Sequence, residues 1–237
     1  MYKEKSLNLN NIFSFWNDFQ DEEKFLFYNP NEKEIIMGAK RLKTFKHNES
    51  FDGYKYIFST KTFFDSVKDS IWNDFKSENI AFSYYLKIKD NKQTLYYQGI
   101  DRKFCDNTMD EEYYNYTLAN TDYDDWKELF NISYDKILTK KINKVVLSRE
   151  VIVDLSKRPR EECIIKRLID NNSGNFIFAY SKGSKCFLGA TPEILLEKKK
   201  NKIISHAVAG TLLKDKKNDS KNREEFLKDE KNSHEHD

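Results

Sequence analysis

Two charged residues in the second half of the sequence stand where a side chain could serve in acid–base chemistry. Lys144 opens the run KVVLSR, in a segment whose dense valines predict a β-strand over 144–155. Glu193 follows a Thr-Pro turn in FLGATPEILLE, and proline biases Thr191 toward an extended conformation, so we expect Glu193 near the start of the next strand. A lysine serves as a general base only if desolvation or nearby positive charge removes its proton near neutral pH. The plain alternative for both residues is a solvated side chain at a strand edge.

Two other patterns could hold an anion or a cation. AVAGT, at 207–211, ends a predicted strand, and Gly210 would let backbone N–H groups approach an anion closely, although it could equally be an ordinary turn glycine. In NSHEHD, the two histidines lie roughly 200° apart on a helix, which excludes the zinc pattern with histidines four residues apart. Glu235, between them, suits a hard cation such as Mg²⁺.

The composition favours a small-molecule or protein partner. Of 237 residues, 41 are Lys or Arg and 39 are Asp or Glu, so the net charge of +2 gives no field of one sign to gather nucleic acid or membrane lipid. Three cysteines without CxxC spacing favour a reducing compartment, and no secretory leader or membrane-spanning window is apparent, so we predict a soluble cytoplasmic protein. No P-loop, dinucleotide fingerprint or nucleophile elbow is present.

The hydrophobic pattern predicts strands in the first half and a mixture of helices and strands in the second. We expect a short helix around 12–19, a turn at 29–31, a hairpin over 87–98 and an acidic linker at 107–125. Further helices are predicted at 126–138, 158–170 and 219–237. The remaining strands are expected at FLFY, 33–45, 54–58, 80–88, NFIFAYS, KCFLG, EILLEKK and KIISHAVAG.

Taken in this order, KVVLSRE, GNFIFAY, FLGATPEILLE, AVAGT and EKNSHEH resemble the chorismate-utilising enzymes, most closely the isochorismate synthases. The resemblance runs from Trp126 to Asp237. Before it, where members usually carry a glycine pair, the chain reads FFDSVKDSIWNDF. The resemblance implies an α+β fold of antiparallel sheets flanked by helices, incomplete at the C-terminus. It also implies a variable N-terminal region over 1–120 and the first part of the catalytic domain over 121–237.

The resemblance further implies roles for single residues. Lys144 would activate water for attack at C2 of chorismate, and Glu193 would protonate the departing C4 hydroxyl, an isomerase reaction. Such a pair must start as a neutral amine and a protonated carboxyl, and burial favours both. The AGT segment would contact a substrate carboxylate through Ala209, Gly210 and Thr211, with the last two as donors, and Glu235 would bind Mg²⁺ as a Lewis acid.

The same positions separate the subfamilies. Water-using members carry a lysine at position 144, aminodeoxychorismate synthases carry a lysine where this chain has Ala209, and salicylate synthases carry a glutamate where it has Asn232. Isochorismate synthase is therefore favoured, with salicylate synthase second, and the product could feed menaquinone or siderophore biosynthesis. Because a second magnesium-binding glutamate is expected after Asp237, two hypotheses stay open. The chain is either an incomplete enzyme or a non-catalytic remnant that acts as a binding module.

Overall fold

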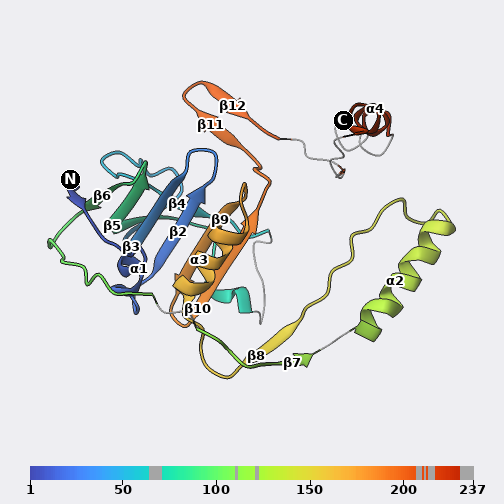
Figure 1. Ribbon diagram of the computed structural model, residues 1–237, viewed down its shortest axis with the longest axis horizontal. Coiled ribbons are helices and arrows are strands. Elements are labelled where there is room, and N and C mark those ends of the chain that lie inside the picture. The colour runs from blue at the N-terminus through green and yellow to red at the C-terminus, as the bar shows by residue number, and fades with distance from the viewer. Residues whose placement is uncertain are drawn as a thin grey trace. The chain divides into compact units, whose positions relative to one another are not determined.

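A computed structural model describes residues 1–63, 71–109, 112–120, 123–206, 210, 212 and 217–229 (Figure 1). Its contacts divide the chain into two compact units, which we describe separately. Unit 1 comprises Met1–Asn107 and Ile165–Asp237, and unit 2 comprises Thr108–Ile164. These units are defined by contacts, and the family-based boundary between 1–120 and 121–237 stays a prediction.

Unit 1 is built on an eight-stranded antiparallel sheet (Figure 1). The path through the sheet runs β1-β6-β5-β3-β2-β9-β10, and β4 pairs with β5. Its strands are β1 (Lys3–Leu7), β2 (Lys24–Asn29), β3 (Glu34–Phe45), β4 (Phe58–Thr60), β5 (Glu78–Lys89), β6 (Lys92–Tyr97), β9 (Phe176–Lys182) and β10 (Lys185–Thr191). The first strands and the last ones are thus joined where β2 pairs with β9.

The predicted hairpin at 87–98 is confirmed. Asp90 and Asn91 connect β5 to β6 with φ angles of 51° and 60°. Asp and Asn tolerate this left-handed region, and two such residues in succession give a turn whose twist matches that of the flanking strands. The register of β6 against β5 follows from this turn.

The core of unit 1 lies on the sheet. Aromatic and β-branched residues fill β5, and seven consecutive residues from Ile80 to Leu86 are buried. One buried cluster consists of Phe25, Ile80, Phe82, Tyr85 and Tyr180. The short helix α1 (Ser14–Asn17) adds buried Phe15 and Trp16 and is shorter than the predicted 12–19. Together these contacts unite strands that are far apart in the sequence.

Unit 1 also contains short elements outside the main sheet. A 3₁₀ helix, η1 (Ile71–Asp74), precedes β5, and β11 (Glu197–Lys199) pairs with β12 (Lys202–Ile204). Helix α4 (Asp219–Leu227) has no buried residue. The strand predicted for EILLEKK covers only Glu197–Lys199, and the end of the predicted 219–237 helix lies outside the described residues.

Unit 2 contains β7 (Tyr116–Asn120), which pairs with β8 (Ile152–Leu155), and helix α2 (Tyr123–Leu138). Helix α2 confirms the prediction for 126–138, whereas the expected linker at 107–125 includes β7. The strand predicted over 144–155 is realised only at Ile152–Leu155, because β7 is the only partner available among the described residues and it is short.

Helix α3 (Glu161–Asn171) confirms the helix predicted over 158–170, but it begins three residues later, so Pro159 lies before it and not in its first turn. Glu161 and Glu162 lie in its first turn, where negative charge is favoured. Arg160 pairs with Glu162 at 2.6 Å, and its backbone N–H donates to the Tyr114 hydroxyl at 3.0 Å. Among the described residues, no helix has the length and apolar character needed to span a membrane.

Candidate active site

The turn that carries Glu193 is held by a neighbouring side chain. The backbone N–H of Glu193 donates to the Thr191 hydroxyl oxygen at 3.2 Å, and that hydroxyl lies 3.4 Å from the Glu193 carbonyl oxygen. Further along, the Ser205 hydroxyl donates to the Leu195 carbonyl at 3.0 Å. Glu193 therefore follows the end of β10, in an exposed turn, and the expectation that it opens the next strand is wrong.

The glycine of FLGATPE lies in β10, the strand that leads to this turn. Gly189 on β10 faces Phe178 on β9, and a Cβ added to Gly189 would lie 2.9 Å from the Phe178 ring. At the end of the same pairing, Thr191 faces Phe176. A larger residue at 189 would require the Phe178 ring to move, so the glycine lets this ring lie directly across β10, the strand that ends at Thr191.

Lys144 lies in unit 2, in the stretch before β8 that has no regular secondary structure. Its side chain is exposed. In the same stretch, the Arg149 guanidinium lies 6.0 Å from the centre of the Tyr123 ring, which belongs to α2. Lys144 and Glu193 thus belong to different units.

The predicted substrate-carboxylate and metal residues are only partly within the described chain. Gly210 has a φ of 61°, in the left-handed region that favours glycine. Ala209, Thr211 and Glu235 lie outside the described residues. Within the described ranges, no group of three His, Cys, Asp or Glu side chains could hold a metal ion.

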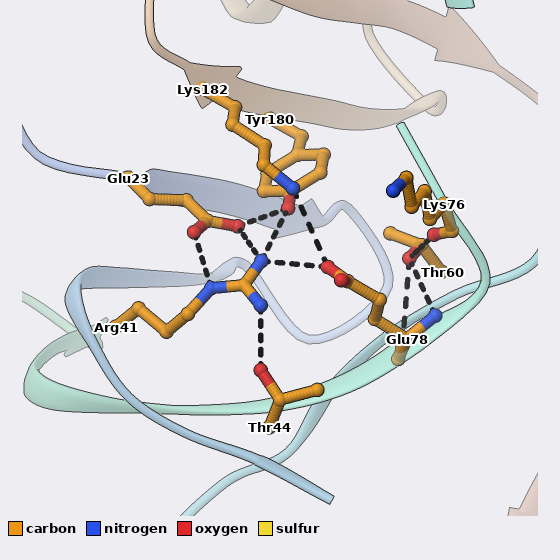
Figure 2. Close-up of polar contacts among 8 residues, drawn as sticks. All are labelled: Glu23, Arg41, Thr44, Thr60, Lys76, Glu78, Tyr180 and Lys182. Atoms are coloured by element: carbon orange, nitrogen blue, oxygen red, sulfur yellow. Dashed lines mark hydrogen bonds and ion pairs between the residues drawn. The ribbon is translucent and has the colours of Figure 1, made fainter. Parts of the chain in front are cut away.

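A partly buried polar cluster in unit 1 was not predicted. Figure 2 shows the guanidinium of Arg41, on β3, between two carboxylates. Its Nε and one Nη each donate to Glu23 at 2.5 Å, and an Nη donates to Glu78 at 2.7 Å. The Tyr180 hydroxyl also donates to Glu23, and Lys182 lies 3.5 Å from Glu78. The cluster joins β3, β5 and β9 to the residue before β2.

The charges in this cluster reinforce one another. Hydrogen bonds to Glu23 raise the pKa of Arg41, in spite of partial burial. Burial by itself would raise the pKa of Glu78, but the hydrogen bond and charge of Arg41 outweigh it and lower that pKa. Burial and the hydrogen bond to Glu23 raise the pKa of Tyr180. Arg41, Glu78 and Tyr180 therefore hold their ordinary charge states at neutral pH, which is typical of a structural cluster.

Beside this cluster, β4, β9 and η1 border a pocket of ≈ 690 Å³. Its wall is mostly aromatic, with hydroxyl and amino groups at Thr60, Lys61 and Lys76. The aromatic lining residues are Phe27, Phe58, Phe63, Trp72, Phe75, Phe178, Tyr180 and Phe187. Neither Lys144 nor Glu193 lines it, so this pocket is separate from the predicted catalytic residues.

Sequence comparison places the chain among known proteins. A family model described as "Chorismate binding enzyme" matches residues 87–237. The isochorismate synthase MenF of Bacillus subtilis is 32% identical over 118 residues, covering 49% of this chain and 25% of that protein. The salicylate biosynthesis isochorismate synthase of Pseudomonas aeruginosa is 28% identical over 113 residues, covering 47% of this chain and 24% of that protein. The aligned part is thus about a quarter of either curated relative.

Structure comparison extends the similarity to the first half of the chain. The menaquinone-specific isochorismate synthase MenF from Escherichia coli matches with a TM-score of 0.66 at 16% identity, over 99% of this chain and 60% of that one. A putative 2,3-dihydroxybenzoate-specific isochorismate synthase, DhbC from Bacillus anthracis, matches with a TM-score of 0.58 at 21% identity, over 93% and 58%. At these identities the likeness shows the fold alone, and it confirms the predicted fold class.

Proposed function

Because the chain belongs to the family of chorismate-binding enzymes, we propose that it carries one part of the active site of an isochorismate synthase. The observation that carries this proposal is the anchored turn after β10. There the Thr191 hydroxyl accepts a hydrogen bond from the backbone N–H of Glu193. Gly189, two residues before Thr191, lies against the Phe178 ring of the neighbouring strand. The sequence likeness to the isochorismate synthase of B. subtilis supports the same reaction.

In the proposed reaction, Lys144 accepts a proton from water as the water oxygen bonds to C2 of chorismate. The two conjugated ring double bonds shift, the C4–O bond breaks, and Glu193 donates a proton to the departing hydroxyl. One water enters and one leaves, so the product is an isomer of the substrate. Each proton transfer needs its donor or acceptor within about 3 Å of the reacting oxygen. The proposed reaction therefore requires the Glu193 carboxyl group and the Lys144 amine, from units 1 and 2, to reach the same chorismate ring.

The substrate carboxylate is proposed to contact Ala209, Gly210 and Thr211. Of these three residues, Gly210 is the one whose backbone the structure describes, and its φ of 61° lies in the left-handed region that favours glycine. Because glycine has no side chain, an anion could approach its backbone closely. Backbone N–H groups of this kind bind anions without a cationic side chain.

Magnesium is proposed as the cofactor, with Glu235 as a ligand, on the resemblance alone. When bound, the ion would polarise and orient a substrate carboxylate. Glu235→Ala should raise the Mg²⁺ concentration needed for half-maximal turnover at least about tenfold, since one carboxylate ligand is lost. Glu224→Ala, an exposed carboxylate on α4, is the matched control. An equal Mg²⁺ requirement in both variants would contradict the role of Glu235.

Product analysis distinguishes the proposed reaction from its alternatives. The chain is incubated with chorismate and Mg²⁺, and the products are separated by chromatography. Isochorismate is the expected product. Salicylate as the main product would favour the salicylate synthase alternative. A folded protein that neither converts nor binds chorismate would leave the non-catalytic binding module as the better description.

A further inference from the structure

The pocket of ≈ 690 Å³ in unit 1 has no part in the proposed reaction, because neither Lys144 nor Glu193 lines it. Its volume lies within the range of about 300–1,000 Å³ that is usual for pockets that bind small molecules. All of its described lining residues belong to unit 1, so its walls come from one compact body. The pocket is therefore a candidate site for a second small molecule.

The wall of this pocket is a set of aromatic rings that contact one another. The ring centre of Phe187, on β10, lies 5.1 Å from that of Phe178 on β9 and 5.1 Å from that of Trp72 in η1. The Phe75 and Tyr180 rings are 5.5 Å apart. Trp72 and Phe187 meet at 82° and are still 42% and 41% exposed. A planar aromatic ligand could extend this edge-to-face arrangement and cover the exposed rings.

The charged groups of the wall are cationic. Among the described lining residues, Lys61 and Lys76 carry a charge and none is Asp or Glu. Both lysines are exposed, and neither forms an ion pair within the described part of the chain. Asp74 of η1 is paired with Lys185 at 2.6 Å, and the carboxylates of the cluster in Figure 2 are paired with Arg41. The pocket therefore favours a ligand with a negative charge.

Hydrogen bonds hold the two lysine-bearing segments side by side. The Thr60 hydroxyl donates to the Lys76 carbonyl oxygen at 2.5 Å, as Figure 2 shows. The backbone N–H of Thr62 donates to the Ser77 hydroxyl oxygen at 3.0 Å. Lys61 lies between the two threonines, so its backbone runs beside that of Lys76. One anionic group could thus contact both ammonium groups.

We propose that this pocket, bounded by β4, η1, β9 and β10, binds an aromatic carboxylate. The aromatic wall contacts its ring, and Lys61 and Lys76 pair with its carboxylate. Chorismate is a different kind of molecule, since its ring is not aromatic. The inference goes beyond the proposed function, and it stands whether or not Lys144 and Glu193 carry out the proposed reaction.

Isothermal titration calorimetry with three probes tests the ligand class. 2-Naphthoate is an aromatic carboxylate, 2-naphthamide has the same rings without the charge, and decahydro-2-naphthoate has the charge without the aromatic rings. 2-Naphthoate should bind the chain at a single site with a dissociation constant below about 1 mM. The other two probes should each bind at least about fivefold more weakly. A failure of 2-naphthoate to bind the folded chain would overturn the proposal, as would equal affinities for all three probes.

Two double variants locate the carboxylate. Lys61→Met combined with Lys76→Met should weaken the binding of 2-naphthoate at least about fivefold and leave that of 2-naphthamide unchanged. Lys3→Met combined with Lys92→Met removes the same charge at exposed residues outside the lining and should change neither affinity. Equal affinities of the two double variants for 2-naphthoate would overturn the proposal.

A single variant locates the ring. Trp72→Ala removes part of the aromatic wall and should weaken 2-naphthoate and 2-naphthamide alike, by about fivefold. Trp126→Ala, in unit 2, is the control and should change neither affinity. Circular dichroism verifies that both variants are folded. Binding that Trp72→Ala leaves unchanged would overturn the proposal, as would binding that occurs only where sedimentation shows a dimer. Because no turnover is measured, an inactive chain would argue against the reaction and not against this site.

Discussion

The hydroxyl of Thr191 accepts a hydrogen bond from the backbone N–H of Glu193 at 3.2 Å. Thr191 is the last residue of β10, and Pro192 separates it from Glu193. The contact therefore ties the backbone of Glu193, which lies just outside the eight-stranded sheet, to the last residue of β10.

The Thr191 contact predicts a local change on substitution. Thr191→Val keeps the shape of the side chain but removes the hydroxyl. Since such a hydrogen bond contributes about 1 kcal/mol, the Glu193 amide should exchange about fivefold faster with deuterium. Thr191→Ser keeps the hydroxyl and should preserve the slower rate. Equal rates in the two variants would mean that the turn is held by something other than this hydroxyl.

The Arg41 cluster predicts a large loss of stability on truncation. Arg41→Met would leave Glu23 partly buried without its cation and Glu78 with only the more distant Lys182, so the free energy of unfolding should fall by about 2–3 kcal/mol. Lys40→Met, at the neighbouring exposed residue, removes an ion pair of 3.8 Å and should change it by less than about 0.5 kcal/mol. Urea unfolding, followed by the fluorescence of buried Trp16, measures both. Similar losses in the two variants would refute a special role for Arg41.

Glu32 predicts a dependence of stability on acid pH. Hydrogen bonds from Lys89 and Lys199 lower its pKa from 4.5 to about 2. A lowered pKa in the folded protein means that the ionised form stabilises folding. This stabilisation is complete above pH 4.5 and is lost as the pH falls toward about 2.

Glu32→Gln should therefore lower the free energy of unfolding at pH 7, and its difference from the unsubstituted chain should shrink toward zero between pH 4.5 and about 2. Added salt should reduce the difference at pH 7, because the groups are partly exposed. Urea unfolding at a series of pH values measures this. A difference that stays the same from pH 7 to pH 3 would contradict the assignment.

The sequence predicts much of the sheet because the signals there are local. The Asp90-Asn91 turn and the apolar, aromatic-rich run of β5 indicate a hairpin by themselves. The segment 144–155 shows the opposite case: its valines favour a strand, but strands need partners, and within the described residues only Ile152–Leu155 has one. A valine-rich sequence can indicate that a segment favours a β-strand, but it does not show which strand would pair with it.

Local sequence signals also decide which residues of unit 1 could be identified in advance. The Thr-Pro-Glu order points to Glu193, and a threonine two residues before a backbone N–H is itself a signal for the Thr191 contact. Arg41 could not be predicted in this way. Its partners Glu23, Glu78 and Tyr180 are separated from it by 18, 37 and 139 residues, and a bulge between Arg41 and Lys43 interrupts the strand.

The most direct test of the proposed function is the rate of isochorismate formation by the chain, compared with its Lys144→Ala and Glu193→Gln variants. Chromatography of the products from chorismate and Mg²⁺ gives each rate. Each variant should lose about 10²- to 10⁴-fold in turnover, the usual contribution of a general acid or base. Isochorismate formation at an unchanged rate by the Lys144→Ala variant would contradict the assignment of Lys144 as the base.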